Sequence, residues 1–194
     1  MKKILTIMLI IVAVFSYAIV YADGINEVLS SSILRLHIIA ATESEADNLI
    51  KLNVRDYISE NLAETKLAPY SREYTDECER LANVRLKELN CGYTATAKLE
   101  RVYIPKKSYK GLTLPSGQYN AIRIVLGEGV GQNWWCVAYP ALCFSEEMKG
   151  ALSEEGKNKL IEVIPKDIYE VITDETEYRF FIVDLIGKIL EKTT

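Results

Sequence analysis

The sequence predicts a single α+β domain on the far side of a membrane, with a small antiparallel or mixed sheet packed against helices. Three observations predict this class. An apolar N-terminal run follows two lysines, strand-like and helix-like patterns are mixed along the rest, and 194 residues suit one domain. The composition, 49% apolar and 26% charged, is that of a globular chain and excludes a disordered or collagen-like one.

The N-terminal segment predicts export. Two lysines precede the uncharged run Ile4–Ala22, and a basic end followed by an apolar run is typical of an export signal. The Val-Tyr-Ala ending favours cleavage before Asp23, while a retained anchor is the alternative because the run is just long enough to span a bilayer. We therefore divide the chain into a signal peptide or membrane anchor over 1–22 and an extracytoplasmic domain over 23–194.

The first half of the domain predicts a strand and two helices. After a polar lead-in, residues 33–40 alternate apolar side chains with Arg35 and His37, which indicates a half-buried strand with a polar face. Residues 46–62 place their apolar side chains on one helical stripe. A second helix begins after Ser71, and Gly92 is expected to end it, because glycine tolerates the left-handed backbone.

The second half predicts three strands and further helices. Residues 93–104 alternate, the Lys-, Gly- and Pro-rich stretch 105–117 is expected to be a loop, and strands follow over 119–126 and 134–139. These three strands are expected to form a meander. Charged helical pieces follow over 145–163, and helical spacing returns over 178–190.

Several functional classes are excluded by composition and motif. A net charge of −4 argues against a nucleic-acid binder, and one histidine excludes multi-histidine metal sites. The run Gly127–Gly131 has a G-x-G-x-G pattern but leads into a strand, so the helix N-terminus that would bind phosphate is missing. We therefore expect no cofactor, no metal and no small-molecule substrate.

The four cysteines allow one plausible disulfide. Cys78 and Cys91 are placed on one helix, too far apart to bond, and Cys78 is expected to be a core residue. Cys136 and Cys143 lie seven residues apart with a proline between them, and we predict that they pair in an oxidising compartment. Apolar surroundings raise the pKa of a thiol, so a cysteine nucleophile with His37 as its base is not expected.

A set of motifs runs through nearly the whole exported part. The motifs are Leu34–Ala40, Lys51–Asp56, Leu114–Tyr119, Ala121–Gly129, Asn133–Val137, Leu142–Phe144 and Glu177–Asp184. Taken together they resemble the stage II sporulation protein R family, and the G-E-G-x-G-x-N-W-W-C run is their most specific part. Ala141 departs from the pattern, in which a second proline is expected after Pro140.

The resemblance implies a function that composition alone does not. Family members are exported from the forespore into the space between the forespore and mother-cell membranes. There they activate a membrane-embedded sporulation aspartic protease of the mother cell, which then processes pro-sigma-E. The resemblance therefore implies an activating ligand with a protein partner, and neither an enzyme nor a catalytic residue.

The hypothesis for the partner interface rests on one short segment. The residues expected to form it are Gly127, Glu128, Gly129, Gly131, Asn133, Trp134 and Trp135. Neighbours on a strand face opposite ways, so one indole is expected to point outward as a recognition anchor, unless helices bury both.

Two other classes of function stay open. One is a cell-envelope-binding module, and the other is a peptidoglycan hydrolase of the sporulation septum. Arg35, Arg123 and Glu128 are the charged residues available to a hydrolase, but no motif places them together.

Overall fold

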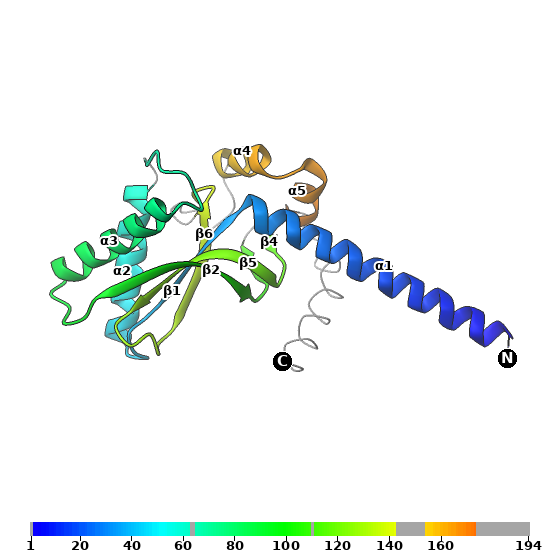
Figure 1. The fold of residues 1–194 in the computed structure, drawn as a ribbon, viewed down its shortest axis with the longest axis horizontal. Coiled ribbons are helices and arrows are strands. Elements are labelled where there is room, and N and C mark those ends of the chain that lie inside the picture. The colour runs from blue at the N-terminus through cyan, green and yellow to red at the C-terminus, as the bar shows by residue number, and fades with distance from the viewer. Residues whose placement is uncertain (1, 63–64, 110, 143–153, 174–194) are drawn as a thin grey trace.

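A four-stranded mixed sheet with helices on both faces forms the body of the protein, and a long helix projects from it (Figure 1). The structure is a computed structural model that describes residues 2–62, 65–109, 111–142 and 154–173. Its elements are α1 (Lys2–Ser32), β1 (Leu34–Ile39), α2 (Glu45–Leu62), α3 (Arg72–Glu88), β2 (Ala95–Ile104), β3 (Lys107–Tyr109), β4 (Leu112–Leu114), β5 (Gly117–Leu126), β6 (Asn133–Tyr139), α4 (Glu154–Val163) and α5 (Lys166–Thr173).

The strand order in the main sheet is β2-β5-β1-β6. β1 runs parallel to β5 and antiparallel to β6, and β2 is antiparallel to β5. The α+β class with a mixed sheet is therefore confirmed. The expected meander is wrong, because β1 inserts between β5 and β6.

The polar face predicted for β1 is also wrong. All six of its residues are buried, including Arg35 and His37. A central strand with helices on both sides has no solvated face, so these two polar side chains must find their partners inside the protein.

Each face of the sheet has its own core. On one face Leu36, Ile38 and Ile122 pack beneath α2 and α3. On the other face Tyr119 and Val137 pack with apolar residues from the end of α1, from β4, and from α4 and α5. Because successive strand residues face opposite ways, the sheet divides the apolar residues of the domain between these two layers.

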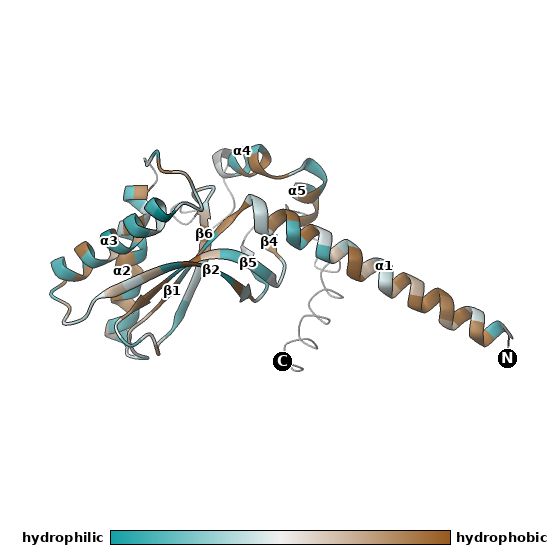
Figure 2. Cartoon of the chain, in the orientation of Figure 1, coloured by the Kyte–Doolittle hydropathy of each residue, from teal (hydrophilic) through white to brown (hydrophobic). Residues whose placement is uncertain are grey.

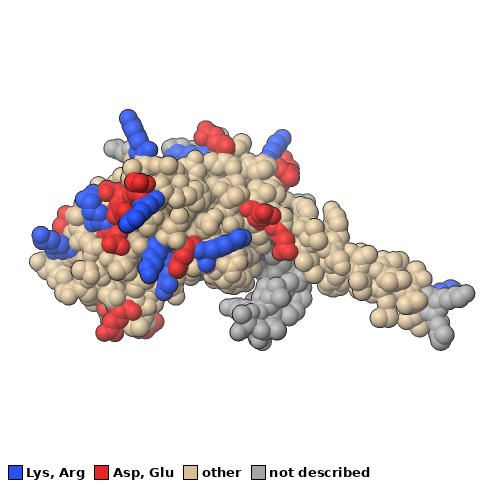
Figure 3. All heavy atoms as spheres, in the orientation of Figure 1, with Lys and Arg blue, Asp and Glu red and all other residues tan. Residues whose placement is uncertain are grey.

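Helix α1 joins the predicted export segment to the domain without a break. Its first part is apolar and almost free of charge (Figures 2 and 3), and it is long and apolar enough to cross a membrane, a test that a signal sequence also passes. The polar lead-in expected over 23–32 is helical instead, with Ile25 and Leu29 buried in the second core. The N-terminal helix therefore fits a signal anchor.

Three further details differ from expectation. Helix α3 ends at Glu88, and Asn90 rather than Gly92 takes the left-handed conformation, with a φ of 55°. The stretch expected to be a loop carries the small β3–β4 hairpin. The helix expected over 178–190 and the helical piece expected over 145–153 lie outside the described residues.

Candidate functional site

The glycine loop between β5 and β6 is bonded along its length to neighbouring loops. The Gly127 N–H donates to Thr94 O at 2.9 Å, and the Gly131 N–H donates to Ala40 O at 3.0 Å. Gly129 has a φ of 66°, which favours glycine. A Cβ on Gly131 would lie 1.9 Å from the carbonyl oxygen of Thr42. Glycine is therefore required here for close backbone approach, and the loop is held in place.

A buried lysine supports the loop from below. Lys51 on α2 donates from Nζ to Asn48 Oδ1 at 2.7 Å and to the Gln132 carbonyl oxygen at 3.2 Å. Burial lowers the pKa of Lys51. Lys51 begins one of the motifs named above, but no role was predicted for it. Its position three residues before Val54, on the apolar stripe of a helix, was the available sign that it is buried. Lys51 ties α2 to the start of β6.

Trp134 faces the layer of α2 and α3. It is half-buried against the first core, and the guanidinium carbon of Arg55 lies 4.2 Å from the centroid of its ring. Such a cation over an indole face is attractive. Among the described residues, its Nε1 atom has no hydrogen-bond partner although it is buried.

Trp135 faces the opposite layer. Its ring stacks on the imidazole of His37, with centroids 3.5 Å apart, and His37 Nε2 lies 2.6 Å from Asn133 Oδ1. Burial lowers the pKa of His37, which favours the neutral imidazole. The two indoles do face opposite ways, as expected. The alternatives were that one indole points outward or that helices bury both. Neither holds in full, because both indoles are half-buried.

The seven residues predicted for the interface form a continuous strip at one end of the sheet. Within it Glu128 and Asn133 are exposed, and between them Val130 has 62% of its surface exposed. Gly131 is buried, and the two tryptophans, at the β6 end of the strip, are half-buried on opposite faces of the strand. Chemically this strip can present an acid, an amide and an apolar side chain in a fixed arrangement.

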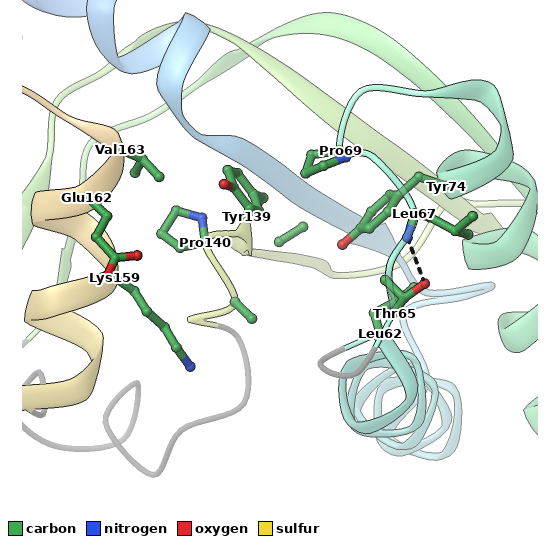
Figure 4. Close-up of a pocket in the computed structure, with 12 residues that line it drawn as sticks. Leu62, Thr65, Leu67, Pro69, Tyr74, Tyr139, Pro140, Lys159, Glu162 and Val163 are labelled. Atoms are coloured by element: carbon green, nitrogen blue, oxygen red, sulfur yellow. Dashed lines mark hydrogen bonds between the residues drawn. The ribbon is translucent and has the colours of Figure 1, made fainter.

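A concave feature lies at the other end of β6. It is a cavity of about 240 Å³ between the segment that follows α2, the start of α3 and helix α4 (Figure 4). Tyr74, Tyr139 and Pro140 line it on one side, and Lys159 and Glu162 on another; the Tyr139–Pro140 peptide is cis. Sequence reasoning missed this cavity because its walls come from separate segments.

The charged residues considered for a hydrolase have different neighbours. Arg35 is buried and donates from Nε to the Cys136 carbonyl oxygen at 2.9 Å. Arg123 pairs with Glu100 at 3.1 Å, and Glu128 is exposed in the glycine loop.

The cysteines that can be placed are buried or lie outside the sheet. Burial raises the pKa of the Cys78 thiol to about 12, which makes it a poor nucleophile. Cys91 lies beyond the end of α3, not on the helix as expected. Cys143 lies outside the described residues, so its pairing with Cys136 stays a prediction. In the described ranges no group of three or more His, Cys, Asp or Glu residues could hold a metal ion.

The fold defines an α+β domain with an apolar N-terminal helix, and its candidate site is a partly exposed strip held by backbone hydrogen bonds. The family model for stage II sporulation protein R matches residues 30–149, and the chain belongs to this family. It is also similar to the stage II sporulation protein R of Bacillus subtilis (strain 168), with 26% identity over 186 residues, 84% of this chain and 83% of that protein. No solved structure matches the chain.

The matched region has a clear structural meaning. It begins at the end of α1 and contains the complete sheet together with α2 and α3. The glycine loop and both tryptophans fall inside it. Membership in this family supports a role in sporulation.

Proposed function

We propose that this protein is an exported signal of endospore formation that activates a membrane-embedded aspartic protease of the mother cell, which then processes pro-sigma-E. The observation that carries the proposal is the family match, which covers the entire sheet. In this proposal the chain leaves the forespore and acts in the space between the two cell membranes. The apolar part of α1 supports passage into or across a membrane.

The proposed contact surface is the glycine rim, defined as Gly127, Glu128, Gly129, Gly131, Asn133, Trp134 and Trp135. Its backbone is already held by the hydrogen bonds to Thr94 and Ala40. A rim ordered before binding loses little conformational freedom on contact, which favours affinity. Differential affinity for the active state of the protease would then shift its population toward activity.

In this proposal the protein breaks no bond itself. The histidine is stacked on Trp135 and held near Asn133, and its lowered pKa reflects burial. The Cys78 thiol is buried with a raised pKa. The imidazole and the thiol are both packed in the interior of the domain. This packing supports the proposal of a ligand rather than an enzyme.

Reconstitution tests the proposal. The chain, either complete or exported as residues 23–194, is expressed with the membrane protease and a pro-sigma-E reporter in a host that does not sporulate. We expect reporter cleavage only when the chain is present. Exported, folded protein that triggers no cleavage would contradict the proposal. Co-sedimentation with cell wall, or release of peptidoglycan fragments, would then favour the envelope-binding or hydrolase alternative.

Exposed residues test the rim itself. Glu128→Arg changes the charge of the rim, and Val130→Asp changes the polarity of the exposed residue between Gly129 and Gly131. Neither side chain belongs to a core, so folding of the double variant should persist. We expect reporter cleavage to fall about tenfold, which corresponds to about 1.4 kcal/mol of binding free energy. Glu60→Arg, on the exposed part of α2, is the matched control and should leave cleavage unchanged. Full cleavage with the double variant would remove the rim from the interface.

A further inference from the structure

The outer edge of β2 is closed along its first half by side chains from α3. The Ala95 N–H donates to Asn83 Oδ1 and the Ala95 carbonyl oxygen accepts from Asn83 Nδ2, both at 2.9 Å. The Ala97 N–H donates to Glu79 Oε2 at 2.6 Å. Since the direction of backbone groups alternates along a strand, odd-numbered residues of β2 point their N–H and C=O groups away from β5.

The second half of this edge is not closed by any of the residues that the structure describes. By the same alternation Leu99, Arg101 and Tyr103 direct their backbone groups outward, and among the described residues no hydrogen bond to these outward groups is found. Leu99 is 38% exposed and Arg101 is exposed. The pairing of β2 with β5 runs through all ten residues without a bulge. A regular edge with unpaired backbone groups is a template for an added strand.

Charge selects the kind of strand that can be added. Arg101 within the open half and Lys98 just before it are exposed, while Glu100 is paired with Arg123 at 3.1 Å, so among the described residues the unpaired charge along this part of β2 is positive. Basic and acidic side chains lie together over this part of the domain in Figure 3. An added strand that carries acidic residues would meet these free basic groups.

A second copy of the chain is a poor occupant. If two open halves pair in full, with Leu99 opposite Tyr103, the two Arg101 side chains lie directly opposite each other. Like charges in that position are destabilising. A pairing of two copies that is shifted toward Ala97 is blocked, because the Ala97 N–H already donates a hydrogen bond to Glu79.

We infer that residues 99–103 of the β2 edge bind an extended, acidic segment of the protein partner by strand addition. This inference rests on the proposed function and adds a second contact, separate from the glycine rim. Backbone hydrogen bonds would supply much of the affinity, and Arg101 and Leu99 would supply charge and apolar selectivity.

Proline substitution tests this edge directly. Arg101→Pro removes an outward N–H that the sheet does not use, and proline is tolerated at such positions on an edge strand. The measurement is co-purification of the chain with the detergent-solubilised membrane protease, together with reporter cleavage. We expect retention to fall about tenfold or more for Arg101→Pro and for Arg101→Glu. Arg101→Gln, which keeps the N–H and removes only the charge, should lose less.

The outcomes separate the inference from the proposed function. Wild-type retention and cleavage by folded Arg101→Pro and Arg101→Glu would overturn the inference and leave the proposed function standing. If the wild-type chain itself neither co-purifies nor triggers cleavage, the proposed function fails and this inference fails with it. If circular dichroism shows that Arg101→Pro does not fold, Arg101→Glu and Leu99→Pro are used in its place. Wild-type retention and cleavage by both folded variants would then overturn the inference. Self-association of the wild type that Arg101→Pro abolishes would assign the edge to a second copy and overturn the inference.

Discussion

The imidazole of His37 lies flat against the indole of Trp135, with ring centroids 3.5 Å apart and ring planes 15° apart. The pair joins β1 to β6 at a position where the two residues are direct partners in the register. Asn133, two residues from Trp135 on the same strand face, lies within hydrogen-bond distance of the same imidazole. His37 is therefore a titratable group beneath the glycine rim whose protonation can be followed by pH.

The stability of the domain should fall as His37 is forced to take a proton. Burial lowers the folded-state pKa of His37 from the ordinary 6.5, so the unfolded state binds more protons as the pH drops below that value. The contribution of neutral His37 to the free energy of unfolding is complete above pH 6.5. Below that pH it is lost, by at most about 1.4 kcal/mol per pH unit. Urea unfolding between about pH 7.5 and 5 measures it.

The matched variant for this titration is His37→Phe, which keeps an aromatic ring for the stack and cannot titrate. Its free energy of unfolding should vary less over the same pH range. Identical pH dependence in wild type and variant would contradict the assignment. Asp47 does not interfere, because the Thr42 hydrogen bond lowers its pKa below 3.8 and its own contribution is lost only at more acidic pH.

Gly131→Ala should destabilise the domain more than any exposed glycine replacement. The new Cβ would lie 1.9 Å from the Thr42 carbonyl oxygen, so the backbone of the glycine loop must move. We expect a loss of about 1–3 kcal/mol, the range of overpacked sites. Gly92→Ala is the control, because nothing lies within 4 Å of its Cβ position. Equal stability of both variants by denaturant unfolding would show that the loop is not held as described.

The end of α1 should behave as part of the domain. Leu29 is fully buried and Ile25 is nearly so, and Leu29→Ala should cost about 2–5 kcal/mol. A chain starting at Asp23 should therefore fold, whereas one starting at Ile33 should not. Circular dichroism and thermal unfolding of the two chains check this. Cooperative unfolding of the shorter chain would mean that the helical end contributes little.

The Cys136–Cys143 disulfide remains a prediction that peptide mass mapping can check. Cys78 and Cys91 are free thiols, so the prediction leaves both of them outside the link. Mapping without reductant should show the 136–143 link and two alkylated cysteines. Reduction should cost about 2 kcal/mol, the scale of a short closed loop. A link that includes Cys78 or Cys91 would contradict the prediction.

Local elements could be predicted from the sequence where periodicity and capping were strong. The helix from residue 46 to Leu62 was found within one residue at each end, and the start of the next helix was found at its Ser71 cap, because apolar spacing and capping are local signals. The end of that second helix was not found, because it stops at Glu88 and not at Gly92. The four strands of the main sheet were found as well, within two residues at each end, whereas the β3–β4 hairpin lies in the stretch expected to be a loop. Their order was not, because the placement of β1 between β5 and β6 is a long-range pairing that no local pattern encodes.

The candidate site shows the same division. The glycine loop and the adjacent tryptophans could be singled out because they are consecutive in sequence. The roles of Lys51, Arg55 and His37 could not, since each acts on a residue at least 79 positions away. Polar residues on an apolar stripe were the one available sign that such contacts exist.

The central position of β1 also governs when the domain can fold. Arg35 pairs with Ala121 on one side and with Val137 on the other, so the first strand of the sheet in the sequence must wait for the last two. Closing such distant pairs is slow and is entropically costly until the later strands are present. The sheet can therefore be completed only after nearly the whole domain is available, and under the proposed function this places the final folding step after export.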